Sequence, residues 1–373
     1  MSVTSRLDSF QRRHRWAGFP IAVVYKFGED QGPYLAALIT YYGFLALFPL
    51  LLLLASVLGF VLQNDPDLQR RILDSTLSQF PVIGDEIRRA RAGNPPGAGD
   101  TQGLQGSAVA LTVGALVAIY GALGVAQALQ NAMNVAWSVP RNRRPNPLKM
   151  RLRSLVLITF GGVAVLATTV LSALGGSAGA FGADLEQWST ILVVFVAVVV
   201  NAAVFILAFR ICTTHPTTLG ALVPGAITAA VVWQLLQLFG TAYVGNVVKN
   251  AGATYGVFAL VLGLLAWIFL AAVGVVMSTE INVVRAKRLY PRALMTPFTD
   301  DVDLTAADRR VYTDAAMAQQ AKGFQWVTVS FDDDGQQASA RRRVRFESGE
   351  QATEEPAGVE GSDDRAPPAG PNG

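Results

Sequence analysis

The chain has 373 residues, of which 51% are apolar and 15% are charged, with a formal net charge of +3. A soluble protein spreads its charged residues along the chain. Here they are confined to gaps between long uncharged stretches, which excludes a soluble globular fold. The only cysteine, Cys212, excludes an internal disulfide.

Six uncharged stretches predict the architecture. Each exceeds the roughly 20 residues of helix that cross a bilayer. Backbone groups in hydrocarbon must pair internally, and the apolar runs 50–54 and 191–200 lack the alternation of barrel strands. We therefore predict an all-α polytopic integral membrane protein with six transmembrane helices and amphipathic interfacial helices. The stretches without Asp, Glu, Lys or Arg are 31–64, 101–140, 154–183, 187–209, 211–248 and 250–279.

Residues 1–30 are predicted to form a cytoplasmic amphipathic segment. The segment is basic and contains aromatic side chains suited to the headgroup region, namely Phe10, Trp16, Phe19 and Tyr25. No apolar run begins before about residue 35, and that run is too long for a signal peptide, so we expect none to be cleaved.

Residues 31–292 are predicted to form the membrane domain. Pro49 lies inside the first span and predicts a helix kink there. In the loop at about 65–105, apolar residues recur at near-helical spacing, which favours a short amphipathic helix at the outer interface. A solvated connection is the alternative. Small residues such as Gly121 and Gly124 are expected to let neighbouring helices approach closely.

The distribution of Lys and Arg predicts the orientation in the cytoplasmic membrane. Basic residues gather before the first span, in the loop 141–153 and after the last span, whereas the loops around 184–186 and 249 hold almost none. Cytoplasmic loops retain Lys and Arg, so both termini are predicted to be cytoplasmic, with these side chains contacting anionic lipid headgroups.

Residues 293–373 are predicted to form a cytoplasmic tail. A soluble helix at 304–322, capped near Thr305, is followed by one short strand at 326–331. From Asp332 on, the sequence is acidic and rich in Pro and Gly, so the tail is expected to be mostly disordered there.

A polar stripe follows one face of the second span. Its members recur at offsets of 3, 4 and 7, and polar residues of the fourth and fifth spans are candidates to face the same interior. Two interpretations stay open: hydrogen bonds between helices, or the wall of a polar groove for lipid headgroups. The candidate groove residues are Gln127, Gln130, Asn131, Asn134, Asn201, Gln234 and Gln237.

Glu280 is the most conspicuous single residue, because thirty uncharged residues precede it in the last span. An acid at that depth needs a partner, and Arg285 or Arg210 is the candidate for a buried ion pair with it. Breaking a buried pair leaves an uncompensated charge, so Glu280→Gln is expected to lower stability. A role in a substrate or coupling site is the alternative.

Signatures of enzymes are scarce. The two histidines, His14 and His215, are far apart in sequence, and neither has the spacing of metal ligands. We predict no catalytic residues, no metal, no cofactor and no binding of nucleic acid.

Several motifs follow one another in a recognisable order. They are Thr40-Tyr41-Tyr42, Leu47-Phe48-Pro49-Leu50-Leu51, Ala128-Leu129-Gln130-Asn131-Ala132-Met133-Asn134 with Trp137, Val223-Pro224-Gly225-Ala226 with Trp233, Thr254-Tyr255-Gly256 and Glu280-Ile281-Asn282. With these motifs the chain resembles the YihY/BrkB-like family of bacterial inner-membrane proteins over about residues 20–290. The chain departs from the family around 212–218 and after 293.

The resemblance implies six spans, cytoplasmic termini and a role in the bacterial envelope. Members of this family have carried the label ribonuclease BN, which we reject because the sequence shows neither a metal-ligand cluster nor a basic-aromatic surface for nucleic acid. Two functions of different class are carried forward. The favoured one is a transporter or flippase-like protein for lipids or other envelope amphiphiles, and the other is a non-transporting membrane scaffold that recruits partners through its tail.

Overall fold

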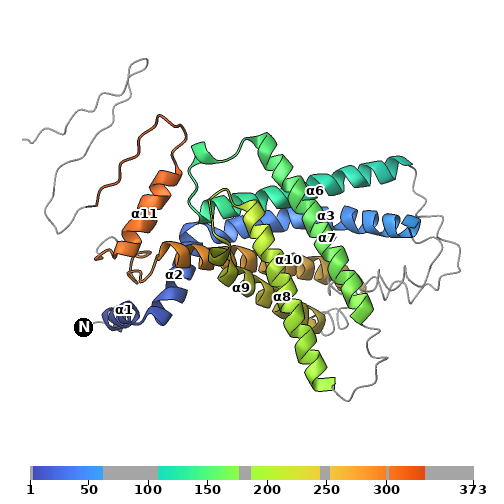
Figure 1. The fold of residues 1–373 in the computed structure, drawn as a ribbon, viewed down its shortest axis with the longest axis horizontal. Helices are drawn as coiled ribbons and strands as arrows, with labels where there is room; N and C mark the ends of the chain where they lie inside the picture. Colours follow the sequence, from blue (N-terminus) through green and yellow to red (C-terminus); the bar gives the residue numbers. More distant parts are fainter. Residues whose placement is uncertain (1–2, 62–107, 176–185, 244–252, 300–301, 332–373) are drawn as a thin grey trace, which may run out of the picture. The chain divides into compact units, whose positions relative to one another are not determined.

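The computed structural model describes the backbone of residues 3–61, 108–175, 186–243, 253–299 and 302–331. Within these ranges the chain is helical and contains no strand, which confirms the all-α prediction (Figure 1). The amphipathic helix expected at 65–105 and the tail from 332 lie outside the described residues.

The described chain begins with two shorter helices, α1 (Val3–Arg13) and α2 (Arg15–Glu29). Long helices follow, and a short helix, α11, comes after the last of them. These are α3 (Gly32–Val61), α6 (Ala108–Ala136), α7 (Pro147–Gly175), α8 (Glu186–Cys212), α9 (Leu219–Tyr243), α10 (Ala253–Lys287) and α11 (Ala306–Ala318).

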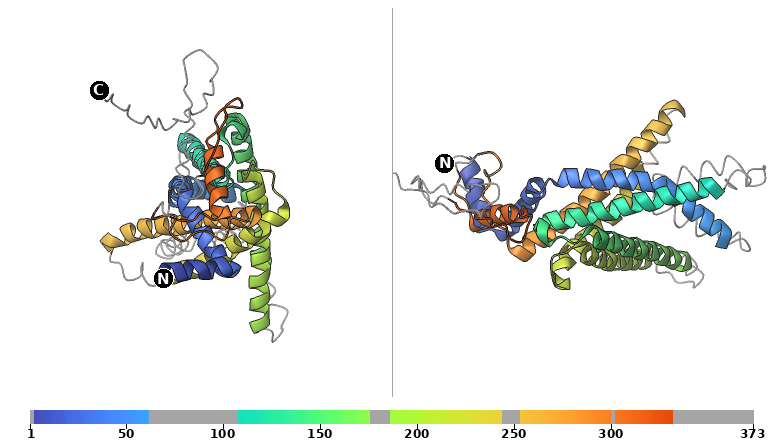
Figure 2. Two further views of the ribbon diagram at one scale, coloured as in Figure 1. Left: turned by 90° about the vertical axis from the view of Figure 1, so that its left-hand side faces the viewer. Right: turned by 90° about the horizontal axis from the view of Figure 1, so that it is seen from above.

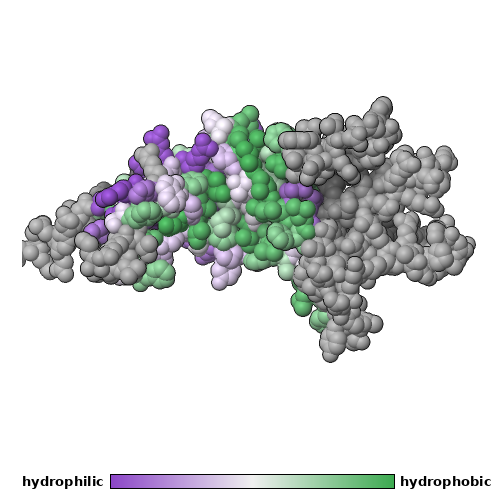
Figure 3. All heavy atoms as spheres, turned by 90° about the horizontal axis from the view of Figure 1, so that it is seen from below, coloured by the Kyte–Doolittle hydropathy of each residue, from purple (hydrophilic) through white to green (hydrophobic). Residues whose placement is uncertain are grey.

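Four segments of the described residues are long and apolar enough to cross a membrane: Leu116–Ala136, Phe195–Cys212, Leu219–Gly240 and Val261–Lys287. The apolar segment of α3 found by the same criteria, Gly32–Leu47, is shorter. Figure 3 shows hydrophobic side chains gathered in a broad band over one face of the described helices. The structure therefore fits a membrane-spanning bundle, and the number of six spans stays a prediction.

Helices α3 and α6 lie side by side, as Figure 2 also shows, and α10 packs against both of them. Their contact depends on small residues, because a Cβ at Gly121 would lie 2.8 Å from the Cα of Ala46. At Gly124 it would lie 2.2 Å from the ring of Tyr42. The close approach expected at these two glycines is thus confirmed, whereas Gly161 and Gly162 have no such neighbour within 4 Å.

One buried apolar cluster joins most of the elements at the end of the bundle where α2, α6 and α10 meet. Ala22 of α2 and Met133 of α6 belong to it, together with Phe209 of α8, Leu222 of α9 and Val283 of α10. Trp137, just after α6, stacks on His215 with ring centroids 4.9 Å apart. The buried charged side chains described below lie at this same end of the bundle, where Lys26 bonds the carbonyl of Ala136.

The segment after α10 folds back onto this end of the bundle. Helix α11 begins at the predicted cap, because Thr305 accepts a hydrogen bond from the backbone N–H of Asp308 and Asp308 accepts one from that of Thr305. The strand expected at 326–331 is wrong: these residues are irregular, since no strand in the described chain pairs with them. Met1–Val327 form one compact unit and Thr328–Gly373 a second.

Candidate functional site

Three ionisable side chains meet where α2 packs against α10. The Nζ of Lys26 bonds the carboxylate of Asp30 and lies 3.8 Å from Oε2 of Glu280. Glu280 has no exposed surface, and the side chains of Lys26 and Asp30 are 2% and 13% exposed. We call these three residues the Lys26 cluster.

The sequence of α2 explains how two members of the cluster come together. Lys26 and Asp30 are four residues apart, which places them on one face of the helix and its C-cap. Gln31 then adopts a positive φ of 57°, and α3 begins at Gly32. Lys26 also donates a hydrogen bond of 3.2 Å to the carbonyl of Ala136, so this ammonium joins α2, α6 and α10.

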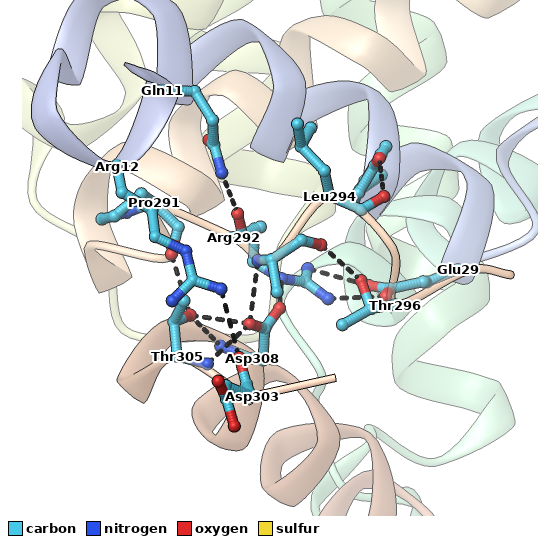
Figure 4. Close-up of polar contacts among 12 residues, drawn as sticks. Gln11, Arg12, Glu29, Pro291, Arg292, Leu294, Thr296, Asp303, Thr305 and Asp308 are labelled. Atoms are coloured by element: carbon cyan, nitrogen blue, oxygen red, sulfur yellow. Dashed lines mark hydrogen bonds and ion pairs between the residues drawn. The ribbon is translucent and has the colours of Figure 1, made fainter. Parts of the chain in front are cut away.

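A second buried cation lies just after α10. The guanidinium of Arg292 has no exposed surface and binds both carboxylate oxygens of Glu29, at 3.0 and 2.6 Å. Its Nε also donates to Asp308 of α11 (Figure 4). We call Arg292, Glu29 and Asp308 the Arg292 cluster; it joins the end of α2 to the start of α11.

Further hydrogen bonds hold the segment around Arg292 in place (Figure 4). Gln11 of α1 donates to the carbonyl of Arg292, and Thr305 donates to that of Pro291 at 2.9 Å. Asp308 also accepts from the backbone N–H of Ala293 at 3.0 Å. Asp308 is fully buried, and its carboxylate accepts hydrogen bonds from Arg292 and from the backbone of Ala293.

In both clusters, burial and neighbouring charges shift the pKa of the cation in opposite directions. Burial alone lowers the pKa of Lys26, but the charges of Glu280 and Asp30 outweigh it and raise that pKa above 10.5. In the same way burial lowers the pKa of Arg292, whereas the hydrogen bonds and charges of Glu29 and Asp308 raise it. Both side chains therefore stay cationic.

At Asp30 the effect of burial on the pKa is larger than that of the neighbouring cation. Burial raises the pKa of its carboxyl group above the ordinary value of 3.8, and the charge of Lys26 offsets this only in part. A buried acid that binds a proton more readily than an exposed one can take up or release that proton as the local charge changes. This is the main chemical capacity of the Lys26 cluster.

Three members of the predicted polar stripe bond to neighbouring elements. The amide of Gln130 is buried and donates to Ser154 of α7 at 2.8 Å. Asn131 accepts from Arg144 at 3.2 Å, and Asn134 accepts from the backbone N–H of Thr214 at 3.3 Å. Only the contact of Gln130 is a hydrogen bond between helices; Asn131 and Asn134 bond to the segments between α6 and α7 and after α8. Gln127, Asn201, Gln234 and Gln237 are half-buried, and a groove formed by the seven residues stays a prediction.

The predicted partners of Glu280 require a correction. Glu280 is fully buried, but the cation beside it is Lys26. Arg210 is exposed and donates to the carbonyl of Thr217, and Arg285 is exposed at the end of α10. The packing of α2 against α10 decides the partner, and nothing in the sequence around Glu280 reports that contact. Helix α3 continues through Pro49, whose side chain is not described, so the kink stays a prediction.

Sequence reasoning missed Lys26, Asp30, Arg292 and Asp308 as members of a site. Glu29 and Asp30 lie just before the first predicted span, where charged residues commonly mark the membrane interface. One signal was present: Lys26 and Asp30 have the i, i+4 spacing of a charge pair and follow the uncharged run 16–25. Among the residues that the structure describes, no group of three or more His, Cys, Asp or Glu is arranged to hold a metal ion.

An open apolar hollow lies on the surface between α3 and α10. Its volume is about 380 Å³, within the range of about 300–1,000 Å³ for ligand pockets. Tyr41 at its edge is 58% exposed. Its lining residues are Ala37, Thr40, Tyr41, Leu265, Ala266 and Phe269.

Comparisons with known proteins identify relatives over most of the chain. A family model described as Virulence factor BrkB matches residues 23–300. The putative ribonuclease-like protein YfkH of Bacillus subtilis is 23% identical over 269 residues, which cover 69% of this chain and 91% of YfkH.

The names of two further relatives describe them as membrane proteins. A UPF0761 membrane protein of Stenotrophomonas maltophilia is 27% identical over 294 residues, covering 78% of this chain and 66% of the relative. The inner membrane protein YhjD of Escherichia coli is 25% identical over 285 residues, covering 73% of this chain and 81% of YhjD. No solved structure matches the chain.

Proposed function

The chain belongs to the BrkB family of membrane proteins, and from this premise we propose that it is a transporter or flippase-like protein for lipids or other envelope amphiphiles. In this proposal the protein has six spans, lies in the cytoplasmic membrane with both termini in the cytoplasm, and is not an enzyme. Its Lys and Arg side chains on that side contact anionic headgroups.

The observation that carries the proposal is the apolar hollow between α3 and α10. It opens on a face of the bundle that carries exposed apolar side chains, among them Leu38 and Leu270, and its own lining is almost entirely apolar. An amphiphile needs an apolar surface for its chain and a polar contact beside it. Tyr41 supplies the second, because its ring is exposed at the edge of the hollow and carries a hydroxyl group.

Leaflet exchange of a labelled phospholipid tests the proposal. Vesicles with the purified full chain and vesicles without protein receive a fluorescent phospholipid analogue in both leaflets, and a membrane-impermeant reductant bleaches the outer leaflet. Faster bleaching of the inner-leaflet label in the vesicles that contain protein is expected. Equal rates in the two preparations, together with no binding of the analogue, contradict the proposal.

A specific observation also favours the scaffold as a second candidate. Phe324 and Trp326, which follow α11, are 82% and 93% exposed, and large exposed aromatic side chains are common at protein interfaces. Truncation after Val327 tests whether the tail recruits partners and leaves α11 in place. Helix α11 must be kept because two ion pairs join it to the bundle, Arg292 with Asp308 and Lys287 with Asp314, the latter at 2.8 Å. Substituting Phe324 and Trp326 by Ser in the same protein tests the aromatic contacts. Loss of partner recruitment with lipid exchange intact supports the scaffold.

A further inference from the structure

The Lys26 cluster contains more negative than positive charge, and Lys26 and Glu280 are buried while Asp30 is 13% exposed. One ammonium group faces two carboxylates, those of Asp30 and Glu280. The carbonyl of Ala136, which also accepts from Lys26, adds another negative dipole end. If both acids are ionised, the cluster carries a net charge of −1 in an interior of low dielectric.

Neighbouring charges do not compensate this excess. Besides Asp30 and Lys26, the charged group that acts on Glu280 is Glu29, which adds further negative charge. Arg292, the other buried cation among the described residues, is bound to Glu29 and Asp308. Both of these carboxylates accept hydrogen bonds from it, so its charge is already balanced within the Arg292 cluster.

Glu280 differs from these satisfied carboxylates. Neither Oε1 nor Oε2 has a hydrogen-bond donor, although the side chain is completely buried. An isolated ionised carboxylate in an apolar interior is so costly that such groups take up a proton instead. The carboxyl groups of Asp30 and Glu280 both face the Nζ of Lys26, which bonds Asp30 and lies 3.8 Å from Oε2 of Glu280. An ionised carboxylate is an acceptor only, whereas a protonated carboxyl group can also donate a hydrogen bond.

We propose that Asp30 and Glu280 form a buried proton-binding site, in which the two carboxyl groups share one proton and the Lys26 ammonium is the counter-cation. The proton comes from water and brings the net charge of the three groups from −1 to zero. It also gives one of the two carboxyl groups a hydrogen-bond donor. Two like charges around one ammonium disfavour the second ionisation, and burial, which raises the pKa of Asp30, acts in the same direction.

Infrared spectroscopy of the full chain in lipid nanodiscs tests this site without reference to any transport activity. At neutral pH the wild-type protein is expected to show the carbonyl stretch of a protonated carboxylic acid, and the band should disappear at alkaline pH. Glu280→Gln and Asp30→Asn should each abolish the neutral-pH band. The matched control Asp303→Asn, which alters an exposed acid, should retain it.

If a variant fails to fold, the wild-type spectrum alone still tests the proton-binding site. No protonated carboxyl band at neutral pH in the wild type contradicts the site. A band that persists in Asp30→Asn or in Glu280→Gln also contradicts it, because the proton then does not depend on both groups. Since the readout is spectroscopic, failure of lipid exchange leaves this result unaffected.

Discussion

Arg292 and Asp308 form an ion pair in which neither side chain has exposed surface, and this pair fixes α11 to the end of α2 and α10. Glu29 completes it through two further hydrogen bonds to the guanidinium. The part of the predicted tail up to Val327 therefore belongs to the same compact unit as the long helices. A boundary placed at residue 293 would cut through the Arg292 cluster.

Replacing Arg292 by Met is expected to destabilise the protein strongly. Removing one partner of a buried pair leaves an uncompensated charge, which costs about 3–5 kcal/mol. The change should appear as a lower unfolding temperature in detergent, and the double variant Arg292→Met/Asp308→Asn should recover part of the loss. Arg288→Met, at an exposed position nearby, is the control and should change little. An unfolding temperature equal to that of the wild type shows that the pair contributes nothing.

Replacing Gly225 by Ala is expected to disturb the contact between α9 and α10. The new Cβ would lie 2.0 Å from the carbonyl oxygen of Ser278, and the backbone N–H of Gly225 donates to Asn282 at 2.7 Å. Overpacking of this kind costs about 1–3 kcal/mol.

Gly220→Ala on the same helix provides the matched control. Gly220 has no neighbour within 4 Å of an added Cβ, so Ala there should stabilise the helix by roughly 0.5–1 kcal/mol. Thermal unfolding of the two variants should therefore shift in opposite directions, and equal shifts would show that α9 and α10 do not approach closely at Gly225.

The Lys26 cluster predicts unequal effects for its cation and its deeper acid. Lys26→Met leaves Asp30 and Glu280 without a counter-cation, so it should lower the unfolding temperature markedly. Glu280→Gln imitates the protonated acid and should change stability little near neutral pH. This reverses the expectation from the sequence, which assumed one arginine for one acid. Equally large losses in Lys26→Met and Glu280→Gln would instead indicate a simple ion pair of one cation and one acid.

Stability should depend on pH through Asp30. Burial raises the pKa of this carboxyl above 3.8, so the folded chain binds the proton more tightly than the unfolded chain. The resulting stabilisation is complete below pH 3.8 and is lost as the pH rises through the folded-state value. The unfolding temperature of the wild type minus that of Asp30→Asn should therefore fall with rising pH. A difference that rises with pH contradicts the raised pKa.

Much of the helical framework could be predicted because it depends on local sequence. Long uncharged stretches predicted the long helices, and Thr305 was predicted as the cap of the helix that follows, which is α11. The burial of Glu280 followed from the apolar residues around it. Its partner did not, since Lys26 reaches it only through the packing of α2 on α10.

The contrast between local sequence and tertiary packing also explains the outcome for the polar stripe and for residues 326–331. The face shared by Gln130 and Asn134 was predictable from helical spacing, but a periodic pattern does not report whether a polar side chain meets a donor or a cavity. Residues 326–331 have the composition of a strand, yet a strand forms only with a partner, which the described chain does not provide.

Leaflet exchange of labelled phospholipid, measured for three proteins side by side, shows whether the hollow between α3 and α10 carries lipid. Ala266→Trp fills the hollow between α3 and α10, and Ala203→Trp places the same side chain at an exposed position of α8 that does not line it. Wild type and Ala203→Trp are expected to accelerate exchange, whereas Ala266→Trp should reduce it to the rate of vesicles without protein. Exchange by Ala266→Trp at the wild-type rate, or no acceleration by the wild type, would contradict lipid movement along the hollow.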